Sequence, residues 1–189
     1  MAVRLAALVL GVAFTSPGWS QTPIGGDSVG AAGREQATEL ERFESRTGRA
    51  TVLGYTVLGV AGSVEVSARE YRDAGHPADV TAGLLLEVTQ WYPSERSRAS
   101  FVDEDEIDGL LRGIDYILQN ATSEVTRFSN FEVRYRTKGG FGVAAFSSGE
   151  TIGVVFQSGD VQYSFGRLVH LWQLRELIVR AQALLRKDA

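Results

Sequence analysis

The chain has 189 residues, of which 44% are hydrophobic and 22% are charged; this is ordinary for a globular protein and excludes wholesale disorder. The length suffices for one domain with a sizeable core and is short for two. The absence of cysteine excludes a disulfide framework, a Cys-ligated metal and a lipidated N-terminal cysteine.

Residues 1–20 are predicted to be a signal peptide. Arg4 precedes the apolar run Leu5–Phe14, and the small residues Gly18 and Ser20 stand where a signal peptidase cleaves. The run is too short to span a bilayer about 30 Å thick. We therefore expect a bacterial protein exported to the periplasm or secreted. The alternative is a buried N-terminal helix or strand.

The segment that follows is expected to be a flexible leader, residues 21–33, because it is rich in Gly, Ser and Thr and has no hydrophobic period. Removal of residues 1–20 leaves 18 basic and 23 acidic residues, a net charge of −5. This balance argues against non-specific binding to nucleic acid or anionic lipid. Residues 34–189 are predicted to form a single α+β domain.

Helix and strand signals follow in two series. Arg34–Thr47 carries apolar residues at three-residue spacing, which predicts a short surface helix. After it, the period of hydrophobicity changes to two, which predicts strands. The first strands are Thr51–Val60, Ser63–Arg72, Thr81–Tyr92 and a short Arg98–Val102, followed by a helix in the stretch Phe101–Ile117 that is capped at Asp103. The second series is Phe131–Thr137, Gly140–Ser147, Thr151–Gln157 and Val161–Phe165, with a closing helix Leu168–Arg186.

The two series indicate an internal duplication, about 50–120 and 128–187. Six apolar positions of the first helix, from Ile107 to Leu118, match six of the second, from Leu174 to Leu185, at an offset of 67 residues. At the same offset Val64–Val66 falls on Phe131–Val133. Chance agreement between two sheet-plus-helix units is the alternative. Each helix is expected to cover its own antiparallel sheet.

The ββββα plan of residues 50–186 resembles that of the Whirly and PUR-type single-strand-binding folds. This resemblance lies in the order of elements and implies no site residues. The pattern F-x-D-x-D-E-I-x-x-L-L-x-G-I-x-x-I (Phe101–Ile117), with Y-x-T-x-G (Tyr135–Gly139), resembles a group of small exported bacterial proteins of unknown function. That resemblance implies no activity.

Six carboxylates lie between Phe101 and Ile117 and raise the question of a metal site. A calcium loop counted from Asp103 fails, because its fifth position is Ile107 and its sixth is Asp108. The preferred interpretation is structural, with Asp103 and Glu106 forming a capping box for the helix. Asp108, Arg112 and Asp115 are then expected to form a charged set on its outer face. No metal site is predicted.

No catalytic motif is present. His76 and His170 lie far apart in the sequence without a zinc-binding spacing, and there is no G-x-S-x-G nucleophile elbow. No cofactor is predicted. The sequence favours a non-enzymatic protein, and a hydrolase with an unrecognised site is an alternative. Loss of turnover on substitution of Asp103, His76 or His170 would exclude the non-enzymatic interpretation.

A cationic strand is the candidate binding surface. Arg134, Arg136 and Lys138 alternate with apolar residues, so they share one face, and Arg69 and Arg72 are predicted to extend it. Such a face can bind a polyanion or single-stranded nucleic acid. The other interpretation is a solvated face neutralised by Glu65, Glu70 and Glu87. The leading hypothesis is an exported binding or structural domain whose partner is a protein or a component of the cell envelope.

Overall fold

The computed structural model describes residues 37–121, 130–148 and 151–186. The predicted signal peptide and leader lie outside these residues. Within them, no helix combines the length and apolar composition needed to cross a membrane. The elements, in chain order, are α1 (Glu39–Glu44), β1 (Thr51–Ala61), β2 (Val64–Asp73), β3 (Val80–Gln90), β4 (Arg96–Asp103), η1 (Glu104–Glu106), α2 (Ile107–Asn120), β5 (Glu132–Arg136), β6 (Phe141–Ser148), β7 (Thr151–Ser158), β8 (Val161–Gly166) and α3 (Leu168–Leu185).

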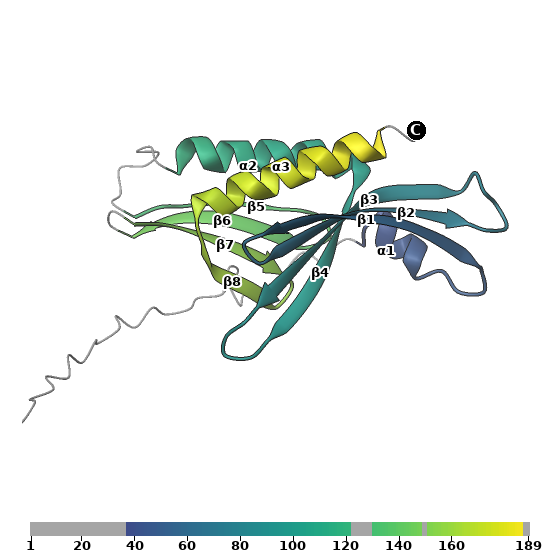
Figure 1. Cartoon of the computed structure of the whole chain (residues 1–189), viewed down its shortest axis with the longest axis horizontal. Helices are drawn as coiled ribbons and strands as arrows, with labels where there is room; N and C mark the ends of the chain where they lie inside the picture. The colour runs from purple at the N-terminus through teal and green to yellow at the C-terminus, as the bar shows by residue number, and fades with distance from the viewer. Residues whose placement is uncertain (1–36, 122–129, 149–150, 187–189) are drawn as a thin grey trace, which may run out of the picture.

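The strands form two antiparallel four-stranded sheets, β1-β2-β3-β4 and β5-β6-β7-β8, each made of consecutive strands (Figure 1). The predicted α+β class is therefore confirmed, and the two sheets fit the predicted duplication. The single offset of 67 residues does not extend to the strands. It places Val64–Val66 of β2, the second strand of its sheet, on residues 131–133 at β5, the first strand of the other.

The helices are exchanged between the two halves. α2 follows the first sheet in the chain but packs on β5 and β6 of the second, where the backbone of Gly113 lies against the ring of Tyr135. α3 follows the second sheet but packs chiefly on β1 and β2 of the first, where the side chain of Leu177 covers Gly59. The expectation that each helix covers its own sheet is wrong. The two helices lie side by side (Figure 1).

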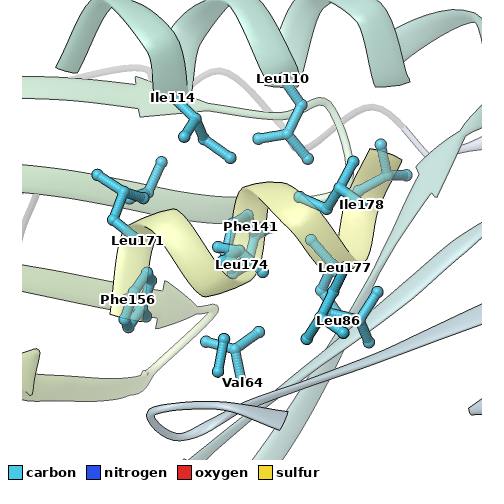
Figure 2. Close-up of a cluster of buried hydrophobic side chains, with 14 of the residues drawn as sticks. Val64, Leu86, Leu110, Ile114, Phe141, Phe156, Leu171, Leu174, Leu177 and Ile178 are labelled. Atoms are coloured by element: carbon cyan, nitrogen blue, oxygen red, sulfur yellow. The ribbon is translucent and has the colours of Figure 1, made fainter. Parts of the chain in front are cut away.

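One continuous core results from this exchange. Figure 2 shows the side chains that meet in it: Val64 and Leu86 from the first sheet, Phe141 and Phe156 from the second, and apolar residues of both helices. The alternation along β2 explains its contribution, since Val64, Val66 and Ala68 point to the helices. Burial of each large apolar side chain contributes about 1.5–3 kcal/mol.

A second, smaller cluster lies on the opposite face of the first sheet. There α1 buries Leu40 and Phe43 against Tyr71, Leu85 and Phe101. The ring centroids of Phe43 and Tyr71 are 6.0 Å apart, a distance typical of favourable aromatic pairs. The first sheet is thus covered on its inner face by α3 and on part of its outer face by α1.

Candidate functional site

The five cations predicted to form a binding surface lie in three different places. Arg69 and Arg72 are three residues apart on β2 and point to opposite faces of the first sheet. Arg134 and Arg136 lie on the outer face of β5 in the second sheet, opposite Ala144 and Gly142 of β6. Lys138 lies in the turn between β5 and β6. Only Arg134 and Arg136 share a face.

All five of these cations have an intramolecular interaction. Arg72 pairs with Glu70 at 2.8 Å, and Arg134 pairs with Glu132 at 3.1 Å. The Arg69 guanidinium donates to the hydroxyl of Tyr71 at 3.4 Å. These pairs reduce the positive potential that each side chain offers to a ligand. A role for the five residues in binding stays a prediction.

Asp103 is the centre of a polar junction, and its carboxylate is buried. Its oxygens accept hydrogen bonds from the backbone N–H groups of Glu39 at 2.9 Å and Leu40 at 3.1 Å, the first residues of α1. Lys138 donates to the same carboxylate at 3.1 Å, and this hydrogen bond raises the pKa of the Lys138 amine. Asp103 therefore joins α1, the end of β4 and the β5–β6 turn. We call this set the Asp103 junction.

The predicted capping box at the start of α2 is wrong. Neither Asp103 nor Glu106 makes a side-chain cap to the helix that follows it. The carboxylate of Asp103 is engaged by α1, and Glu106 accepts from the backbone N–H of Lys138 at 2.8 Å. The capping box in this region belongs to α1, where Thr38 and Glu41 hydrogen-bond each other's backbone N–H groups. The T-x-x-E sequence of residues 38–41 could have revealed it.

The β5–β6 turn packs tightly on this junction. A Cβ atom on Gly139 would lie 2.1 Å from the carbonyl oxygen of Phe101 and 2.9 Å from a methyl carbon of Thr38. The turn therefore leaves no space for a side chain at Gly139. Backbone packing and hydrogen bonds together hold the second sheet to β4 and α1.

Two further acids of the cluster hold α3. The Asp115 carboxylate accepts two hydrogen bonds from Arg175, at 2.5 and 3.2 Å, and this contact raises the pKa of the guanidinium. Asp108 accepts from Gln182 at 2.6 Å and pairs with Arg186. The predicted charged set on α2 is thus an interhelical contact, because Asp108 and Asp115 face α3. Bidentate pairing of this kind fixes orientation as well as adding stability.

The remaining acids do not gather into a metal site. Glu104 and Asp105 line a hollow of about 480 Å³ together with Glu39, Gln182 and Arg186. Among the described residues, no group of three or more His, Asp or Glu side chains has a geometry suited to a metal ion.

The two histidines lie apart from this cluster and serve local structure. His170 accepts from the backbone N–H of Arg167 at 3.2 Å, and burial together with the charge of Arg167 lowers its pKa. His76 lies in the exposed turn after β2, where its backbone N–H donates to Asp73 at 3.1 Å. No catalytic arrangement brings either histidine to Asp103.

Another exposed surface lies at the β3–β4 hairpin, and its residues were not among the predicted site residues. Trp91 and Tyr92, at the tip of the β3–β4 hairpin, are 62% and 76% exposed. The strand ends next to this tip are held by the Thr89 N–H, which donates to the carbonyl oxygen of Ser63 at 2.9 Å, and by a 2.9 Å contact between the hydroxyls of Thr89 and Ser97. Two adjacent large aromatic residues in a turn were the signal that could have identified it.

β4, the strand that returns from this tip, is attached to the second sheet. Arg96 and Arg98 pair with Asp160 in the β7–β8 turn, and the hydrogen bond from Arg96 lowers the pKa of the Asp160 carboxyl. The hydroxyls of Ser100 and Ser158 are 2.6 Å apart in the buried part of the same contact. The cations beside the aromatic tip therefore hold the two sheets together.

Comparison with known protein families, with curated proteins and with solved structures finds no match for this chain.

Proposed function

We propose that this chain is an exported, non-enzymatic binding protein that holds a protein partner through Trp91 and Tyr92. The exposure of these two aromatic side chains at one hairpin tip is the observation that carries the proposal. When a partner covers an exposed aromatic side chain, apolar surface is removed from water, and this stabilises the complex. Trp and Tyr are also enriched among the residues that dominate binding energy.

The contacts around the hairpin tip support the same proposal. The Gln90 side-chain amide donates to the carbonyl oxygen of Tyr92 at 2.6 Å, and Thr89 is hydrogen-bonded to both Ser63 and Ser97. A tip held in this way loses little conformational freedom when it binds, which favours affinity. Polyanion binding by the cationic residues has less support, because Lys138 and Arg134 are engaged by Asp103 and Glu132.

The test compares two matched substitutions at exposed aromatic residues. The mature chain, its Trp91→Ala variant and a Tyr116→Ala control on α2 are used to capture proteins from the envelope of the source cell, and the affinity for each captured protein is then measured by calorimetry. We expect Trp91→Ala to weaken binding by about 30-fold or more, corresponding to a loss of at least about 2 kcal/mol. Tyr116→Ala should bind like the unaltered chain.

Two results would contradict the proposal. One is an affinity for every captured protein that Trp91→Ala leaves unchanged. The other is turnover of a substrate by the purified chain that is abolished by a substitution of Asp103, His76 or His170, since that would make the protein an enzyme.

A further inference from the structure

The edge of the first sheet differs from the other sheet edges. β1 is an edge strand of eleven residues, hydrogen-bonded in the described part of the chain to β2 alone. It contains no charged residue and no proline. An edge strand of this kind presents a row of unpaired backbone N–H and C=O groups to any strand that can approach it.

Each of the other three edges is protected. β4 is attached to the second sheet through Arg98 and Ser100, and β8 lies against β3. β5 has five residues, of which Glu132, Arg134 and Arg136 are charged and exposed. Short length and charge are the usual devices that prevent edge pairing. β1 has neither.

The side chains of β1 are also unusually apolar for exposed positions. Leu53, Tyr55 and Val57 point to the outer face of the sheet, and Tyr55 is 66% exposed. α1 covers β2, β3 and β4 on that face and leaves β1 open. On the inner face, α3 contacts β1 at Gly59, which lies after Leu53, Tyr55 and Val57 in the strand. Both the edge and the outer face from Leu53 to Val57 are therefore accessible.

We propose that β1 pairs in antiparallel fashion with β1 of a second copy of the chain, about a two-fold axis through Tyr55. This pairing would join two four-stranded sheets into one of eight strands. The axis places Leu53 opposite Val57 of the other copy, Gly54 opposite Thr56, and Tyr55 opposite itself. Each apolar residue then meets an apolar residue on the same face.

The composition of β1 is what identifies the second copy as the occupant. A partner strand must be extended, uncharged and apolar on one face over at least five residues, and β1 itself meets this description. Because the strand carries no charge, symmetric pairing brings no like charges opposite one another. A closed two-fold dimer also pairs the β1 edge from Thr51 to Gly59 and leaves only its last two residues, Val60 and Ala61, beyond the paired segment. The aromatic tip takes no part in the pairing.

Sedimentation analysis of the mature chain tests the proposal. We expect a dimer at micromolar concentrations, and a monomer for the Tyr55→Lys variant, which places two ammonium groups at the axis. Tyr116→Lys, the same change at an exposed residue of α2, should remain a dimer. Circular dichroism checks that both variants keep the fold.

Cross-linking tests the register independently. The chain has no cysteine, so Tyr55→Cys introduces a single thiol per copy. Directly opposed residues have Cβ atoms about 4.5–5.5 Å apart, and we expect a short bismaleimide to link this variant into dimers. Tyr116→Cys should remain unlinked. A monomeric unaltered chain, a dimer that persists in Tyr55→Lys, or linking of Tyr116→Cys but not Tyr55→Cys would each overturn the proposal.

Discussion

The carboxylate of Asp103 joins three segments of the chain: α1, the end of β4 and the β5–β6 turn. It accepts two backbone N–H groups of α1 and the amine of Lys138, and it has almost no contact with solvent. A buried carboxylate is costly unless it is fully hydrogen-bonded, and here three donors satisfy it. The residue therefore fixes where α1 docks on the first sheet and where the β5–β6 turn meets β4.

Replacement of Asp103 by Ala should destabilise the fold by about 2–3 kcal/mol, because α1 loses its N-terminal acceptor and Lys138 loses its partner. Urea unfolding measures this loss. Glu104→Ala, at the exposed neighbouring acid, should change the free energy of unfolding by less than about 0.5 kcal/mol.

The coupling between Asp103 and Lys138 provides the decisive comparison. Lys138→Met should cost much less in the Asp103→Ala background than in the unaltered chain, because the contact is already lost. Additive effects of the two substitutions would show that the contact between Asp103 and Lys138 contributes nothing to stability.

The residue scale is where the sequence was least informative. A dense run of acids at a helix start predicts local capping, since the helix dipole and free N–H groups favour it. The backbone partners of Asp103 are instead 63 and 64 residues earlier in the chain, and those of Asp108 and Asp115 lie on α3. Side-chain contacts between distant segments leave no periodic signal in a sequence.

The elements themselves follow closely from the sequence. Strand periodicity, turn residues and two amphipathic helices predicted eight strands and three helices near their observed positions. An apolar helical stripe shows that one face of a helix is buried, but it does not specify which sheet buries it. That ambiguity is why the exchange of α2 and α3 was not predicted.

The docking of α2 on β5 can be tested at Gly113. In an exposed helix, Gly→Ala stabilises by about 1 kcal/mol. Here the added Cβ would lie 2.5 Å from ring atoms of Tyr135, so Gly113→Ala should instead destabilise by about 1–2 kcal/mol in urea unfolding.

The sign of this effect depends on the ring that causes it. In a Tyr135→Ala background, Gly113→Ala should become stabilising, because the collision is removed and the gain in helix propensity remains. A stabilising effect of Gly113→Ala in the unaltered chain would contradict the packing of α2 on the second sheet.

At the scale of the whole molecule, the two halves share a single core. Both sheets and both long helices contribute to one continuous cluster of buried residues. Neither half contains the helix that covers its own sheet, so neither has a complete core. Cooperative unfolding requires that the parts depend on one another, as they do here.

Separated halves test this dependence. Residues 37–121 and 130–186, produced as two polypeptides, should each lack a cooperative thermal transition because their sheets expose apolar faces. When mixed, they should form a one-to-one complex with a cooperative transition, measured by circular dichroism and sedimentation. Cooperative folding of either polypeptide alone would show that the halves are independent units.

The exchange of helices also determines when the protein can fold during its synthesis. β1 and β2 are made early, but α3, which covers them, is the last described element to leave the ribosome. Until it emerges, the apolar inner face of the first sheet has no helix to bury it, and such exposed surfaces bind chaperones. The order of elements along this chain therefore postpones burial of the inner face of the first sheet until α3 has been translated.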